Sequence, residues 1–132
     1  RERLLAGAMI PSAWYLQAQR FRRHARQAMK SLFSQADVLI APATPCSATP
    51  IGAEEMVING QPLPVRASMG MLTQPISFLG LPVVTVPLRT ASGKPIGLQL
   101  IAAPFNEQAC LRAARALEAM GITDARVAES AA

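Results

Sequence analysis

The stretch that decides the fold is TQPISFLGLPVVTVPLRTASGKPIGLQLI, residues 73–101. A Gly-Leu-Pro turn precedes a short β-branched run, Val83 to Val86, which is typical of a buried strand. Pro87 has no N–H to donate to a ladder, so we expect it to end that strand. Ser92 to Pro95 has the composition of a turn, and residues 96–102 alternate between two faces. The pattern predicts an antiparallel pair of strands, which by itself is typical of an ordinary core hairpin.

Upstream, apolar residues recur at steps of three and four and predict an amphipathic helix that begins at Pro11 or Ser12 and ends near Gln35. The residues of its apolar stripe are Trp14, Ala18, Phe21, Ala25, Ala28 and Leu32. A cluster of cations lies mostly off this stripe: Arg20, Arg22, Arg23, Arg26 and Lys30. We expect a solvated or subunit-facing basic side with His24 on the surface. Nucleic-acid binding would require interleaved aromatic residues or a known module.

Asp37 to Pro45 predicts a short buried strand that ends in a loop. Residues 42–64 are rich in Pro, Gly and polar residues, with a turn expected at Ile58 to Gln61, and so long a loop is expected to cover something. A final helix is predicted from Glu107 to Met120, capped by Asn106 and stopped by Gly121, with a polar tail from Thr123 onward. Its expected buried stripe is Cys110, Ala113, Ala114, Leu117 and Met120.

The 132 residues favour one domain, and the 51% hydrophobic content is enough for a core. No run approaches the roughly 20 apolar residues of a membrane helix, so we expect no membrane attachment. Cys46 and Cys110 lack any close spacing, which favours reduced thiols in a cytoplasmic protein. The sequence opens on Arg1 without a Met, and we expect it to be a piece of a longer chain.

A self-contained catalytic site is not evident. A nucleophile needs a base and the base needs an orienting partner, but the single His24 lies among arginines. Lys30 and Lys94 fall in a helix and a turn, and the side-by-side Glu54 and Glu55 lie in a loop, where such a pair is typically solvated. There is no glycine-rich phosphate loop, and one His with two distant Cys does not make a metal site. We therefore expect no metal and no cofactor.

Four blocks, in order along nearly the whole chain, resemble the amidase-signature enzymes. Arg3 to Gly7 fits R-x-x-x-G, residues 15–22 fit Y-x-x-A-x-x-x-R, and residues 37–45 fit D-V-L-x-x-P-x-x-P. Residues 73–107 resemble T-x-P-x-N-x-x-G-L-P-x-x-x-V-P, then G-x-P-x-G-x-Q-x-I and F-x-E. Each block is weak alone, whereas four in order make a strong case. Within the family the chain is most similar to the biuret-type amidohydrolases, and the glutamyl-tRNA amidotransferase A subunits are near relatives.

The resemblance implies the C-terminal portion of an α/β/α sandwich with a mixed sheet, residues 1–132 being part of a single domain. It also implies hydrolysis of amide C–N bonds in a small urea- or biuret-like substrate by a Ser–cis-Ser–Lys triad. No segment here matches the triad, so we expect none of its catalytic residues in this chain and no activity from the chain alone. Arg3, Thr73 and Gln74 are the implied substrate-binding residues, and a small partner subunit of the amidotransferase C type and an oligomer are the implied assembly.

Two departures from the family pattern bear on the substrate. Ser77 stands where the family commonly has Asn, and Gly70 stands where the amidotransferase has an acid for its substrate's ammonium group. The loss of that acid favours a substrate without an amine cation. Arg3 is either a carboxylate-binding arginine or a surface residue near the start of the chain. Two alternative functions stay open: an A-type subunit of an amidotransferase, and a non-enzymatic basic interaction module.

Overall fold

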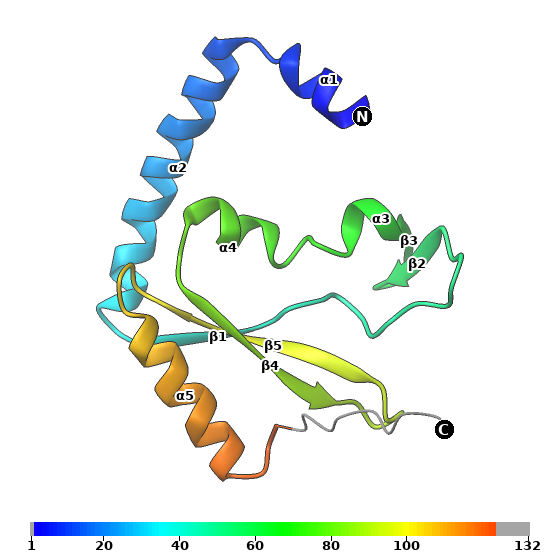
Figure 1. Ribbon diagram of the computed structural model, residues 1–132, viewed down its shortest axis with the longest axis vertical. Helices are drawn as coiled ribbons and strands as arrows, with labels where there is room; N and C mark the ends of the chain where they lie inside the picture. Colours follow the sequence, from blue (N-terminus) through cyan, green and yellow to red (C-terminus); the bar gives the residue numbers. More distant parts are fainter. Residues whose placement is uncertain (1, 124–132) are drawn as a thin grey trace. The chain divides into compact units, whose positions relative to one another are not determined.

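The computed structural model describes residues 2–123 and shows an α/β chain with two antiparallel sheets (Figure 1). The α/β class expected from the sequence is confirmed. The chain divides into two compact units, residues 1–35 and residues 36–132. None of the helices within residues 2–123 is long and apolar enough to cross a membrane.

The first unit consists of two helices, α1 (Glu2–Ala8) and α2 (Ser12–Phe33). Helix α2 starts where the sequence predicts, because extended Pro11 precedes its first turn. Along the predicted amphipathic stripe, Trp14 is 69% exposed, Phe21 61% and Leu32 46%. Neither α1 nor α2 contains a buried residue.

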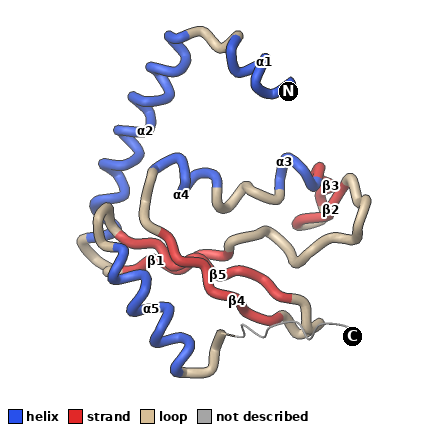
Figure 2. The backbone as a smooth tube through the Cα atoms, in the orientation of Figure 1, coloured by secondary structure: helices blue, strands red, loops and turns tan. Residues whose placement is uncertain are grey.

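The second unit is built on a sheet of three strands in the order β1-β5-β4 (Figure 2). Strand β1 (Val38–Pro42) pairs antiparallel with β5 (Pro95–Ala102), and β5 pairs antiparallel with β4 (Val83–Arg89). The predicted β4–β5 hairpin and the predicted strand at β1 are both confirmed. The long central strand therefore joins a local hairpin to a segment from much earlier in the sequence.

The expectation that Pro87 ends its strand was wrong, because β4 continues through it to Arg89. The Ala102 amide donates to the Pro82 carbonyl at 3.1 Å, which fixes the alternation of bonded and non-bonded positions along β4. Pro87, opposite Gly97, falls where the backbone N would point away from β5. Its missing N–H therefore leaves the β4–β5 ladder intact, which is the way sheets accept proline at an edge.

Helix α5 (Glu107–Ala119) packs on one face of this sheet and ends one residue before the predicted Met120. Ala109 and Cys110 join Ala102 in a core that Val38 and Val84 also contact. The cap and stop are where the sequence predicts, with left-handed Gly121 after the helix, although the Asn106 side chain makes no capping bond. The buried stripe is only partly as expected: Met120, the C-cap residue that follows the helix, is 70% exposed.

The segment predicted as loop, residues 42–64, contains a second hairpin, β2 (Glu55–Ile58) and β3 (Gln61–Pro64). Its turn was predicted correctly, since Asn59 and Gly60 both have positive φ, as a two-residue turn of this kind needs. Two short helices follow, α3 (Val65–Ser68) and α4 (Gln74–Leu79), neither of which was predicted from the sequence. The predicted tail after Thr123 lies outside the described residues.

Candidate functional site

The sheet face opposite α5 carries the features of a binding site. Strand alternation puts Gly97 and Gln99 of β5 on this face, with Thr85 of β4 directly opposite Gln99. Gly97 is a point of close approach: a Cβ there would lie 2.8 Å from both Ala43 Cβ and Thr85 Cγ2. The glycine therefore lets the segment after β1 lie directly against the sheet.

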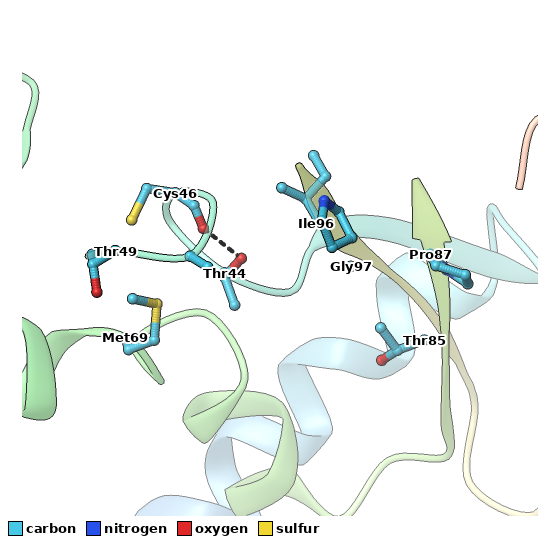
Figure 3. A pocket seen from close by; sticks show the side chains of 10 residues that line it. Thr44, Cys46, Thr49, Met69, Thr85, Pro87, Ile96 and Gly97 are labelled. Atoms are coloured by element: carbon cyan, nitrogen blue, oxygen red, sulfur yellow. Dashed lines mark hydrogen bonds between the residues drawn. The ribbon is translucent and has the colours of Figure 1, made fainter. Parts of the chain in front are cut away.

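A pocket of about 560 Å³ opens on this face (Figure 3). One wall comes from the segment after β1, with Met69 beside it, and the other from the β4–β5 hairpin. The lining residues are Thr44, Cys46, Ala48, Thr49, Met69, Thr85, Pro87, Pro95, Ile96 and Gly97. Their side chains are small or apolar, with three threonine hydroxyls and one thiol as polar groups. Such a surface can bind a small molecule, and none of these lining residues is a general base of the His, Lys or carboxylate type.

The two cysteines have different surroundings. Cys46 lines the pocket, and its thiol lies 3.6 Å from the sulfur of buried Met56 on β2. Cys110 is a buried residue of α5, and its thiol donates to the Pro82 carbonyl at 3.6 Å. Burial raises the pKa of the Cys110 thiol above its ordinary value. Both thiols are free, and no group of three metal-ligating residues occurs within residues 2–123.

The predicted residues Thr73 and Gln74 lie at the start of α4, shortly after the pocket residue Met69 in the chain. The Gly70 carbonyl organises this turn, because it accepts bonds from the Thr73 amide (3.1 Å), the Thr73 hydroxyl (3.2 Å) and the Gln74 amide (2.9 Å). A Cβ on Gly70 would lie 2.9 Å from Gln74 Nε2, so the glycine leaves room for that side chain to fold back. The segment from Gly70 to Gln74 is hereafter the Gly70 turn.

Gln99 connects the Gly70 turn with the sheet. Its Nε2 donates to the Pro42 carbonyl at 2.9 Å and to the Leu72 carbonyl at 3.3 Å. Sequence reasoning placed Gln99 on this face of the strand but gave it no function. The available signal was a polar amide at a central position of an otherwise apolar strand.

Thr73 and Gln74 are chain neighbours at the start of α4 and are not among the residues that line the pocket, while Arg3 lies exposed on α1 in the other unit. Glu54 and Glu55 are exposed, as expected for a solvated pair, and His24 is exposed too. The pocket residues Thr44, Cys46 and Thr85 were not predicted. They come together only through the β1–β5–β4 pairing, which local sequence patterns do not reveal.

The amidase family model matches residues 1–111. The chain belongs to the amidase family. It is 53% identical over 92% of its length to AtzE, a component of the 1-carboxybiuret hydrolase of Pseudomonas sp. (strain ADP). It is 37% identical over 89% of its length to the A subunit of the glutamyl-tRNA(Gln) amidotransferase of Parvibaculum lavamentivorans. The family resemblance drawn from the sequence motifs is therefore confirmed.

A solved structure agrees with the fold of this amidase-family chain. It comes from a vestigial protein complex bearing on the evolutionary origins of an s-triazine catabolic enzyme, and it matches 96% of the chain with a TM-score of 0.87 at 51% identity. The chain spans only part of these relatives: 27% of AtzE, 24% of the amidotransferase polypeptide and 28% of the solved chain.

Proposed function

We propose that residues 1–132 are the C-terminal part of a single amidase domain in a longer amidohydrolase that cleaves amide C–N bonds of a small urea- or biuret-like molecule. The observation that supports this substrate class is the 53% identity to the 1-carboxybiuret hydrolase component AtzE, compared with 37% to an amidotransferase A subunit. Gly70 points the same way, since it offers no acid at the position where the family resemblance gives the amidotransferase one.

In this proposal the chemistry lies outside the chain and the chain supplies binding surface. A Ser–cis-Ser–Lys triad in the rest of the protein attacks the amide carbonyl, releases ammonia or an amine, and hydrolyses the acyl-enzyme. The pocket between the segment after β1 and the β4–β5 hairpin fits a binding wall, because its lining includes no general base. Thr73 and Gln74 contact the substrate in this arrangement, and residues 1–132 alone are inactive.

Arg3 is assigned to a carboxylate of the substrate. A guanidinium grips a planar carboxylate through two parallel hydrogen bonds, which a lysine ammonium cannot reproduce. In the full-length enzyme, Arg3→Lys should lower kcat/KM on a carboxylated biuret by about tenfold or more. An uncharged amide of similar size should be much less affected. Equal losses on both substrates, or no loss on either, would mean that Arg3 does not bind the carboxylate.

The proposal extends to assembly and location. The solved relative comes from a protein complex, which supports a small partner subunit of the amidotransferase C type and an oligomeric full-length enzyme. Two free cysteines are consistent with a cytoplasmic enzyme. Neither a nucleic acid nor a membrane is part of the proposed function.

The decisive experiment is an ammonia-release assay on the full-length protein with biuret, a carboxylated biuret, urea and simple amides. We expect turnover on the biuret-type substrates and none with residues 1–132 alone. The rival function, that of an A-type amidotransferase component, would instead show glutamine-dependent amidation of charged tRNA when its partner proteins are added. Amidation without biuret hydrolysis would replace the proposal with that rival, and release of no ammonia from any amide would refute it.

A further inference from the structure

Gln99 is an unusual residue for the centre of a sheet. It is 2% exposed, and it is the one buried polar side chain among residues 2–123. Burying an amide without hydrogen bonds costs about 1–3 kcal/mol, so a buried glutamine is retained where its bonds serve a purpose. Here the side-chain nitrogen donates to two backbone carbonyls.

The bonding fixes the orientation of the amide. Since both partners are carbonyl oxygens, which only accept, the NH₂ group and not the oxygen must face them. One carbonyl belongs to Pro42 at the end of β1, and the other to Leu72 within the Gly70 turn. The side chain thus joins the sheet to the turn immediately before Thr73.

The Gly70 turn is held together internally, because the Gly70 carbonyl accepts three hydrogen bonds from Thr73 and Gln74. Local bonds of this kind set the shape of the turn but not its position over the sheet. The bond from Gln99 to Leu72 does set that position, since its donor is on β5. A shift of the turn would carry Thr73 and Gln74 with it.

We propose that Gln99 is a positioning residue, which holds the Gly70 turn against the sheet and thereby sets how tightly Thr73 and Gln74 bind the amide substrate. The inference rests on the proposed function, in which these two residues contact the substrate. Without the amide donor, the Pro42 and Leu72 carbonyls lose a buried partner and turn toward water. The turn then samples positions in which its substrate contacts are not made.

The test compares two variants of the full-length protein. Gln99→Met keeps the approximate volume of the side chain and removes both donors. Leu100→Met, one residue along the same strand, is the matched control, because Leu100 is equally buried and lies on the opposite face toward α5. Amide hydrogen exchange in residues 70–76 reports the position of the turn, and KM and kcat on a biuret-type amide report its function.

For Gln99→Met we expect exchange in residues 70–76 to accelerate by about tenfold and KM to rise by about tenfold, with kcat within about twofold of the wild type. Leu100→Met should leave both quantities unchanged. In Gln99→Glu only the protonated carboxyl can donate, and its single O–H can serve one of the two carbonyls, so KM should rise with pH in this variant alone.

Unchanged exchange in Gln99→Met would overturn the inference, because the turn would then be held by other contacts. Faster exchange with an unchanged KM would overturn it as well, since the turn would then not bind substrate. If the full-length protein hydrolyses no amide, the proposed function fails instead. The exchange comparison, which needs no substrate, would still decide whether Gln99 holds the turn.

Discussion

Gly97 shows how a single missing methyl group shapes the site. A side chain there would meet Ala43, just after β1, and Thr85 on β4, and both Gly97 and Thr85 line the pocket. Gly97 is not among the glycines with positive φ, which include Gly80 and Gly93, so its backbone angle does not require a glycine. It is required for space, and this is a property of three segments packed together.

We predict that Gly97→Ala destabilises the full-length protein by about 1–3 kcal/mol, because the new Cβ would meet two side-chain carbons at 2.8 Å. The free energy of unfolding in urea measures the effect. The double variant Gly97→Ala with Thr85→Ser removes one of the two clashing carbons and should recover part of the loss. Wild-type stability in the single variant would show that the sheet widens there at no cost.

Cys110 gives the protein a stability limit at alkaline pH. Its pKa is raised above the ordinary 9.0 by burial, so the folded thiol stays protonated where the unfolded thiol ionises. The contribution to stability is therefore complete below about pH 9 and is lost as pH rises through the folded pKa.

We predict that the free energy of unfolding decreases above about pH 9 with a slope from this one group of at most about 1.4 kcal/mol per pH unit. Cys110→Ala should make the decrease shallower, whatever its effect at neutral pH. Urea titrations between about pH 7 and about pH 10.5 measure both curves. Parallel curves for the two proteins would show that Cys110 does not contribute to the alkaline loss.

At the scale of elements, the β2–β3 hairpin supports one wall of the pocket. It places Met56, which is 6% exposed, against the thiol of Cys46. The hairpin depends on the Asn59-Gly60 turn, in which both residues have positive φ. For residues other than Gly, Asn and Asp, this left-handed backbone conformation is disfavoured by roughly 1–2 kcal/mol.

Gly60→Ala should therefore loosen the hairpin, withdraw Met56 and expose Cys46. We expect alkylation of Cys46 by iodoacetamide, followed by mass spectrometry, to become several-fold faster than in the wild type. Asn59→Gly is the matched control, because glycine accepts the same φ, and its rate should stay near the wild-type value. Equal rates in Gly60→Ala and the wild type would mean that the hairpin does not shield the thiol.

The elements that sequence could predict are those with a local signal. The β4–β5 hairpin, α2 and α5 follow from periodicity and turn residues, and the Asn59-Gly60 turn from its dipeptide. The misses have non-local causes. Pro87 is tolerated because of its register against Gly97, and the role of Gln99 depends on carbonyls from two other segments. The family motifs pointed to Thr73 and Gln74, but they could not show what holds those residues in place.

At the scale of the whole molecule, many large apolar side chains are exposed to solvent. Exposed large side chains include Trp14 and Tyr15 on α2, Ile40 on β1 and Phe105 before α5. Strands β1 and β4 are the two edge strands of the three-stranded sheet. A surface of this kind is expected where more protein, or another chain, normally lies.

We predict that residues 1–132, prepared alone, self-associate and do not behave as a 14.0 kDa monomer. Size-exclusion chromatography with light scattering measures the mass, and dye binding reports the exposed apolar surface. Replacing Trp14, Phe21 and Leu32 together with polar residues should raise the fraction of the protein that is monomeric. A monodisperse monomer with a sharp, reversible unfolding transition would contradict the prediction.

The bonds made by Gln99 also imply an order of folding. They join it to residues 57 and 27 positions earlier in the chain, so they close only after β5 has been synthesised. The β4–β5 hairpin is local and forms early, whereas the pairing with β1 must first overcome the entropy of a long loop. The Gly70 turn leaves the ribosome before the strand that will hold it. A nascent chain stalled short of β5 would therefore carry Thr73 and Gln74 without a fixed place for either.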